Sequence, residues 1–194
     1  MVWICPSSKG LFSVSSYYGV LVVYVDAVSF PWKCVWVSGT PSKVAFFVWT
    51  ATLGRILTID NLIRREHILV NWCCLCCGDI ESVDHLLVHC SVTSRLWMLI
   101  IPTFGLVQLG SVLAVLQSWA GGRVGRRRRK AWMIASHCLM WLIWLERNRH
   151  VFQEVSHSIS WLKRWVFMVL YNWVTGLVHS DVLAYVNFVG DSIA

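Results

Sequence analysis

The sequence predicts a mainly α-helical fold, with a short β region near the N-terminus and a pair of helices at the C-terminal end. After residue 160, apolar side chains recur at three- and four-residue spacing, which is typical of an amphipathic helix. Hydrophobic residues make up 57% of the 194 residues and charged residues 14%, which argues against a disordered chain and allows a sizeable core. Five of the eight cysteines gather within residues 73–90, where they predict a turn held by a metal ion.

The N-terminal half predicts one strand and two helices. Residues 12–15 alternate apolar and serine side chains after a glycine, as in a short strand. A helix is expected from Ser42 to about Leu53, ended by Gly54, and it should be buried because it is apolar nearly all round. A second helix is expected from Ile59 to about Glu66, with Thr58 as its N-cap.

Three further helices are expected. One runs from Asp84 to Met98, one from Trp132 to Arg149, and one starts at about Ser160. The last two form the C-terminal pair, and we interpret their tryptophans as core residues. The helix that ends at Arg149 closes with a polar stretch, residues 146–149.

The cysteine cluster has the spacing of a zinc site. Cys73 and Cys76 are separated by two residues, so a tight turn lets both thiolates grip one ion, and His85 with Cys90 completes a tetrahedral set. Cys74 and Cys77 have the same spacing, so the residues alone leave two registers open.

The second half of this site poses a geometric problem. His85 and Cys90 are five residues apart, which places them on different faces of an ideal helix. Either Cys90 lies where the helix ends or bends, or His89, four residues after His85, is the ligand. Because zinc favours thiolates, Cys90 is the preferred candidate.

A basic run follows a pair of glycines and is expected to form a loop. It places six positive charges in eight residues: Arg123, Arg126, Arg127, Arg128, Arg129 and Lys130. Such a run binds the phosphates of RNA or DNA by counterion release, or serves as a nuclear import signal. The remaining interpretation is a solvated loop that keeps an apolar domain in solution.

The high hydropathy of one segment allows an alternative interpretation, in which the chain is a membrane protein and its cysteine cluster is incidental. Residues 96–116 carry no charge and are long enough to cross a bilayer, but Pro102, Gly105 and Gly110 interrupt them. No basic region followed by an apolar region and a small-residue cleavage site opens the chain. We therefore expect an intracellular protein in a reducing compartment, with the nucleus as one location, and metal rather than disulfides at the cysteines.

Taken in order, these residues resemble the reverse transcriptase zinc-binding domain of plant non-LTR (LINE-type) retrotransposons. The resemblance is specific from Phe30 to Trp97 and looser outside it. The specific part is carried by these residues and ranges: Trp32, Lys33, Trp36, Pro41 to Trp49, Leu57 to Leu62, Cys73, Cys76, Glu81 to Cys90, and Trp97. The looser part extends to Trp3 and to Lys9 to Tyr17 on one side, and to His137 to Asn148 on the other.

The resemblance implies a division of the chain and a set of ligands. It implies an N-terminal lead-in at residues 1–29, the zinc-binding domain at 30–100, an apolar segment with the basic loop at 101–130, and a helical region at 131–194. It places the ligands on Cys73, Cys76, His85 and Cys90, with structural Zn²⁺ as the cofactor. It also implies RNA or DNA as a partner, beside a reverse transcriptase that would act in trans.

Catalysis is not expected, and neither is a small-molecule substrate. Polymerases hold two metal ions with paired carboxylates, whereas the only candidate motif, around Asp26, has a single one. Ribonuclease H chemistry also needs several convergent acidic residues, and the chain has ten Asp and Glu in all. His137 and Cys138 are neighbours on a helix and should point apart. The expectation is a noncatalytic zinc-binding module; the alternative is a truncated retroelement remnant without selected activity.

Overall fold

The computed structural model describes residues 30–104, 110–121, 124–125 and 128–176. The chain divides into two compact units, residues 1–32 and 33–194. The strand expected at residues 12–15 lies outside the described residues, and the described ranges contain helices but no strand. The mainly α-helical class is therefore confirmed.

The described helices are α2 (Trp32–Val35), α3 (Ser42–Thr52), α4 (Ile59–Ile63), the π-helical turn η1 (His85–His89), α5 (Ser91–Phe104), α6 (Val112–Gly121), α7 (Arg129–Gln153) and α8 (Ile159–Thr175). The five expected helices are present in the expected order, but the one predicted from Asp84 to Met98 is divided at Cys90, and two further helices, α2 and α6, were not predicted. Gly54 follows α3 with a φ of +66°, a left-handed conformation that suits glycine, so it ends the helix as predicted.

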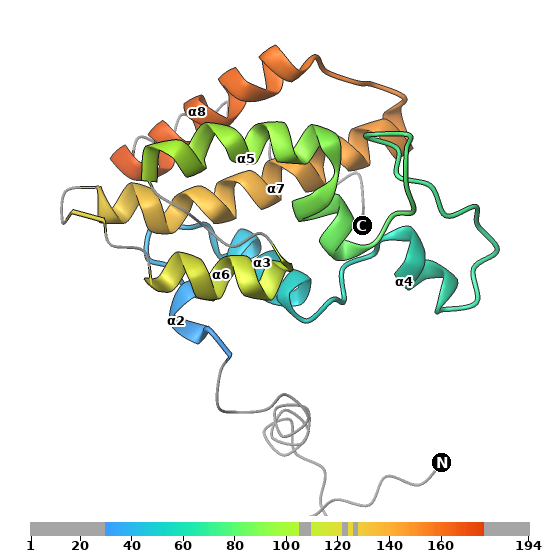
Figure 1. Ribbon diagram of the computed structural model, residues 1–194, viewed down its shortest axis with the longest axis horizontal. Helices are drawn as coiled ribbons and strands as arrows, with labels where there is room; N and C mark the ends of the chain where they lie inside the picture. Colours follow the sequence, from blue (N-terminus) through green and yellow to red (C-terminus); the bar gives the residue numbers. More distant parts are fainter. Residues whose placement is uncertain (1–29, 105–109, 122–123, 126–127, 177–194) are drawn as a thin grey trace, which may run out of the picture. The chain divides into compact units, whose positions relative to one another are not determined.

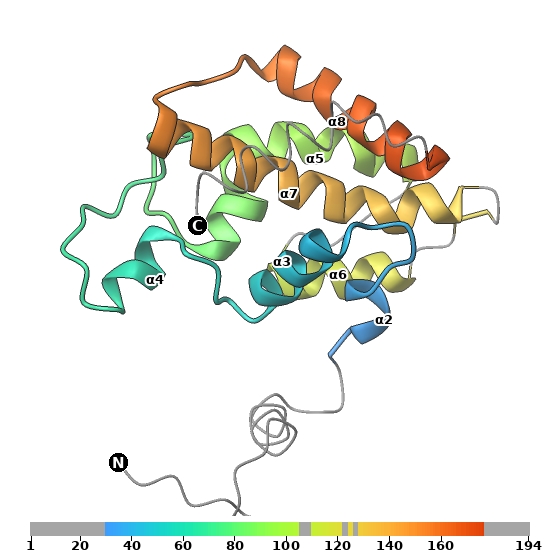
Figure 2. The same cartoon turned by 180° about the vertical axis from the view of Figure 1, so that it is seen from behind.

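The long helix α7 lies at the centre of the second unit and packs against α3, α5, α6, α8 and η1 (Figures 1 and 2). It is buried over most of its length because neighbours cover it on several sides. Helices α7 and α8 form the expected pair and run antiparallel. Lys130 Nζ, at the start of α7, donates to the Val174 carbonyl at the end of α8, and Cys138 Sγ faces the Val166 carbonyl midway along both.

Three tryptophans join the helices on the other side of α7. Trp119 of α6 and Trp132 of α7 stack with ring centroids 3.8 Å apart, and each indole N–H donates to the other residue's carbonyl. Trp97 of α5 meets Trp119 edge to face and donates to the Leu87 carbonyl in η1. These rings are core residues whose N–H groups all have partners, as buried tryptophans require.

Two sequence expectations about burial do not hold. Helix α3 is not buried all round, because Phe46 is 55% exposed while Phe47 packs against Trp141 and Trp144 of α7. On α8, Trp165 is buried as expected, but Trp161 is 38% exposed. The runs of apolar residues therefore predicted that α3 and α8 are helices. They did not predict which face of each helix packs against α7 and which face is exposed.

In the described ranges, no helix is both long enough and apolar enough to cross a bilayer. The uncharged stretch at residues 96–116 is divided between α5 and α6, and its residues 105–109 lie outside the described part of the chain.

Candidate metal centre

The first half of the centre is a tight turn that begins at Cys73. The Cys73 N–H donates to the Asp79 carbonyl and the Cys77 N–H donates to the Cys73 carbonyl, so the chain between them folds back on itself. Cys77 takes a φ of +49°, the left-handed conformation that reverses the chain. The turn directs the Cys73 and Cys76 side chains to the same point, as their spacing predicts.

The second half resolves the five-residue spacing of His85 and Cys90. Residues 85–89 form a π-helical turn, and the Cys90 N–H donates to the His85 carbonyl over 2.7 Å. At Cys90 the backbone leaves helical geometry, with a φ of −51° and a ψ of 136°, before α5 begins. The wider turn and this break place two side chains together that an ideal helix would separate. Cys90 thus lies where the helix breaks, which is the first of the two alternatives that the sequence left open.

The four side chains converge. The sulfurs of Cys73 and Cys90 are 4.0 Å apart, Cys76 Sγ lies 3.3 Å from His85 Nε2, and all four ligand atoms lie within 4.8 Å of one another. A tetrahedral Zn²⁺, with bonds of about 2.3 Å to sulfur and about 2.0 Å to nitrogen, separates sulfurs by about 3.8 Å and sulfur from nitrogen by about 3.5 Å. Three thiols and one imidazole at these separations fit a structural zinc ion.

The protein environment favours a thiolate at Cys90. Hydrogen bonding from the Cys73 thiol lowers the pKa of Cys90 to about 5, and the N–H groups of Thr93 and Val92, in the first turn of α5, act in the same direction. The same hydrogen bond, together with burial, raises the pKa of Cys73 well above its usual range. The pair therefore holds one shared proton, which a bound cation would displace.

The ring of His85 is oriented by a carboxylate. Nε2 faces Cys76, while Nδ1 lies 3.6 Å from Asp79 Oδ2. A carboxylate on the far side of a ligating imidazole holds the orientation of its ring. Asp79 also accepts the Cys73 N–H through its backbone, so one residue supports both halves of the centre.

The remaining candidates lie outside the cluster. Cys74 Sγ faces the Arg147 carbonyl, and burial is the main cause that raises its pKa to about 11. Cys77 is exposed and its sulfur faces the Cys74 carbonyl. His89 Nε2 lies 2.9 Å from the Gly110 carbonyl, away from the other ligands. The structure thus brings together the ligand set that begins with Cys73 and Cys76, and not the one that begins with Cys74 and Cys77.

The loop between the two halves is fixed to α7 by a buried ion pair that the sequence did not predict. Arg147 donates to both oxygens of Glu81, and its Nη2 lies 2.7 Å from Oε1. Glu81 also accepts the Ile59 N–H, which caps α4 in place of the expected Thr58 hydroxyl. Residues 146–149, expected as a polar helix end, are all buried. The family resemblance included Glu81 and, in its looser part, residues 146–148, and this was the signal in the sequence for their importance.

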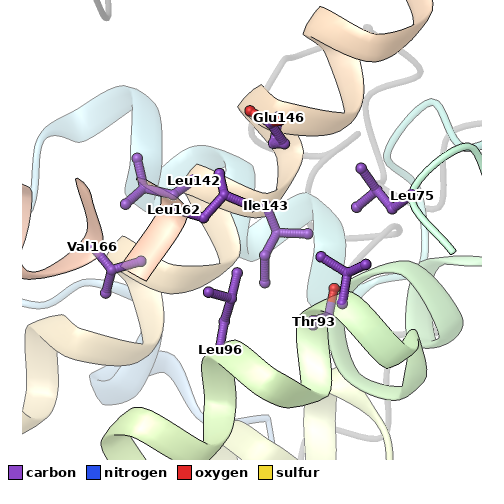
Figure 3. A pocket seen from close by; sticks show the side chains of 9 residues that line it. Leu75, Thr93, Leu96, Leu142, Ile143, Glu146, Leu162 and Val166 are labelled. Carbon is purple, nitrogen blue, oxygen red and sulfur yellow. The ribbon is translucent and has the colours of Figure 1, made fainter. Parts of the chain in front are cut away.

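Leu75 also connects the turn to the helices. Its side chain points toward α5, α7 and α8, where a cavity of about 10 Å³ is lined mainly by apolar groups such as Leu96, Ile143 and Leu162 (Figure 3). This volume has room for about one water molecule. The turn is therefore packed onto the helical core and does not form a separate zinc finger.

The basic run lies apart from this centre. Arg128, Arg129 and Lys130 are exposed, and the last two form the start of α7 instead of the expected loop. Arg123, Arg126 and Arg127 lie outside the described residues. His137 and Cys138 point apart, toward the Val35 and Val166 carbonyls respectively.

The fold and the cluster define a helical protein with a structural zinc site. Residues 12–97 match the family described as zinc-binding in reverse transcriptase, as the motifs in this part of the chain predicted. All four residues of the cluster lie within the match. The chain thus contains a zinc-binding module of retroelement type.

A longer relative extends this likeness. The chain is 27% identical over 174 aligned positions to an Arabidopsis thaliana protein named "Putative ribonuclease H protein". The alignment covers 84% of this chain and 27% of that protein, so the chain spans about a quarter of its relative's length. No solved structure matches the chain significantly.

Proposed function

We propose that the chain is a noncatalytic module in which Zn²⁺, held by Cys73, Cys76, His85 and Cys90, stabilises a surface that contacts RNA or DNA. The convergence of these four side chains is the observation that carries the proposal. Four protein ligands leave a tetrahedral ion no open position for a reactive water. When bound, the ion would supply folding free energy to the turn and to the elements packed on it.

The basic run gives nucleic-acid contact its physical basis. The net charge is +7, and six of the cations lie within residues 123–130. The described members of this run are exposed, so they can neutralise phosphates and release counterions. The family description and the relative's name both refer to enzymes that act on nucleic acids, which supports the same partner class.

The arrangement of carboxylates supports a noncatalytic role. Within the described residues, the zinc cluster is the one group of three or more metal-binding side chains close enough to hold an ion. Glu81 and Glu146 are buried in ion pairs with Arg147 and Arg149. The chemistry of reverse transcription would then come from a reverse transcriptase, and this module would act beside it on the same nucleic acid.

Salt-dependent binding tests the proposal. Fluorescence anisotropy of labelled single-stranded RNA and duplex DNA is measured from low to high salt with the zinc-loaded chain. The test variant carries Arg126→Ala, Arg127→Ala, Arg128→Ala and Arg129→Ala. The matched control loses the same charge at Arg55, Arg64, Arg65 and Arg95, which are exposed elsewhere.

We expect wild type and control to bind alike. The test variant should bind more weakly. Its slope of log affinity against log salt concentration should be lower by about 3, because each lost phosphate contact lowers that slope by about 0.7–0.9. Equal losses in both variants would refute a specific role for the basic run. Absence of binding by a folded, zinc-loaded wild type would refute the proposal and favour a retroelement remnant.

A further inference from the structure

The outer side of α8 carries an aromatic stripe that the zinc site does not use. At alternating spacings of three and four residues lie Trp161, Arg164, Met168 and Tyr171, which share one face of the helix. The apolar residues of this stripe are well exposed, at 38% for Trp161, 47% for Met168 and 62% for Tyr171. The adjacent face packs inward through Leu162, Trp165 and Val169, so the core does not depend on the exposed stripe.

A groove lies along the first half of this stripe. It is lined by Trp161, Arg164, Trp165 and Met168 and has a volume of about 340 Å³. Ligand-binding clefts in proteins have volumes of about 300–1,000 Å³. Two indole rings, a thioether and a guanidinium make a site suited to a flat aromatic group attached to an anion.

Trp161 is held firmly although it is exposed. The ring of His157 stacks on it with centroids 3.9 Å apart, and Trp165 flanks it at 5.0 Å. His157 is fixed in turn by the buried carboxylate of Glu146, which accepts from its backbone N–H and faces its Nδ1. A ring held in this way loses little conformational freedom when a ligand stacks on it.

The charges of this face favour an anionic ligand. Helix α8 contains no Asp or Glu between Ile159 and Thr175, and it carries Lys163 and Arg164. Its C-terminal end meets the basic run, because Lys130 Nζ donates to the Val174 carbonyl over 2.7 Å. Trp161 and Tyr171 are ten residues apart, or about 15 Å along the helix. The stripe therefore leads from the groove toward Lys130, the last residue of the basic run.

We propose that a single-stranded nucleic acid lies along the outer face of α8, with bases stacked on Trp161 and Tyr171 and a phosphate bound by Arg164. This inference rests on the proposed function and gives it a particular surface and strand type. Exposed aromatic side chains beside cations bind single strands without sequence preference, since every base has a π face. Lys130, beside the C-terminal end of α8, would bind the phosphate that continues beyond Tyr171.

Two probes separate base stacking from phosphate binding. Anisotropy is measured with a labelled oligothymidylate and with an abasic oligonucleotide of the same length and charge. The wild-type chain should prefer the thymidine strand. Trp161→Ala or Tyr171→Ala should weaken binding of that strand by about tenfold and leave the abasic strand unchanged. Arg164→Ala should weaken binding of both strands equally.

Matched control variants show whether a loss of binding comes from the removed side chain or from unfolding of the chain. Trp161→Phe and Tyr171→Phe keep an aromatic face and should retain most of the affinity. Trp36→Ala removes an indole that is 52% exposed elsewhere and should change nothing. Zinc content and far-ultraviolet circular dichroism show whether each variant is folded. Tyr171→Ala provides a second test should Trp161→Ala unfold, because the Tyr171 ring is mostly outside the core.

The outcomes distinguish this inference from the function on which it rests. If the wild-type chain binds both strands equally, or if Trp36→Ala costs as much as Tyr171→Ala, the α8 surface is refuted while binding by the basic run stands. If neither strand binds while duplex DNA still does, the α8 surface is refuted and the proposed function stands; if RNA and duplex DNA also fail to bind, both proposals fail. A dimer in sedimentation that Tyr171→Ala converts to monomers would also overturn the inference, since a second copy would then cover the stripe.

Discussion

Arg147 Nη2 lies 2.7 Å from Glu81 Oε1, although the two residues are 66 positions apart in the chain. Both side chains are buried, at 4% and 0% exposed, and the pair joins the loop of the metal centre to the central helix α7. Cys74 reaches the same point, with its sulfur facing the Arg147 carbonyl. The metal centre and the C-terminal helices therefore depend on each other structurally.

We predict that breaking this pair is costly. Glu81→Gln should lower the free energy of unfolding by about 3–5 kcal/mol, because it leaves the Arg147 guanidinium buried without its charge partner. Urea denaturation measures this loss. Arg64→Ala, which removes an ion pair with Asp60 in which the Arg64 side chain is 73% exposed, is the control and should cost no more than about 0.5 kcal/mol. A loss as small as the control's would mean that water reaches Arg147.

Zinc binding should separate the two cysteine registers. Cys73→Ser should abolish the binding of one zinc ion per chain, and with it the cooperative unfolding transition. A structural zinc ion contributes about as much free energy to folding as the whole free energy of unfolding of a typical domain. Cys74→Ser should keep both, because the Cys74 sulfur faces Arg147 and lies outside the cluster. Metal analysis of the two purified variants, beside thermal melts, makes the comparison. The reverse result would assign the ion to the Cys74 register.

Stability should fall in mildly acidic solution because of His137. Burial lowers the pKa of this imidazole to about 4 from its usual 6.5, although its hydrogen bonds to the Val35 and Met133 carbonyls act in the opposite direction. Between these two pH values the unfolded chain binds a proton that the folded chain excludes. The stabilisation is thus complete above pH 6.5, is lost as the pH falls toward 4, and amounts to about 3 kcal/mol.

Comparison with His137→Gln isolates this effect. The glutamine amide can still donate to the Val35 carbonyl but does not titrate. Urea denaturation of both proteins from pH 7 to pH 4 should show wild type losing stability more steeply than the variant. Loss of zinc in the same range affects both proteins and cancels in the difference. Parallel curves would show that His137 takes up its proton in the folded state.

Replacing Cys77 by glycine should stabilise the metal turn. Cys77 has a φ of +49°, a left-handed conformation that costs a side-chain-bearing residue about 1 kcal/mol and glycine almost nothing. Cys77→Gly should therefore raise the midpoint of thermal unfolding by a few degrees with zinc still bound. Cys77→Val should lower it, because a β-branched side chain tolerates this conformation worst. A destabilised glycine variant would show that the Cys77 side chain makes a contact worth more than the strain.

Local patterns predicted the local structure well. The helix at Ser42 begins at the predicted residue and ends one residue early, because an apolar run, a preceding proline and a following glycine are all properties of the neighbouring sequence. The convergence of the four candidate ligands could be predicted for the same reason, since it depends on a short turn and on a helix that breaks at Cys90.

Burial of polar groups could not be predicted in this way. Residues 146–149 contain three charged side chains, which would usually mark an exposed helix end. They are buried because Glu81 and His157 come from elsewhere in the chain to meet Arg147 and Glu146. The exposed ring of Trp161 was missed for a related reason. Periodicity identifies a helix face, but only packing decides whether that face is covered.

The separation of Glu81 and Arg147 also sets an order of events during translation. At about 5–20 residues per second, the ribosome needs roughly 3–13 seconds to add the residues between them. During that interval all four ligands of the metal centre can be available, while the carboxylate of Glu81 still lacks its guanidinium and Leu75 lacks the helices on which it rests. A nascent chain that stalls before α7 is made would carry the whole family match. It would also present an uncovered apolar surface, the kind of surface that chaperones bind.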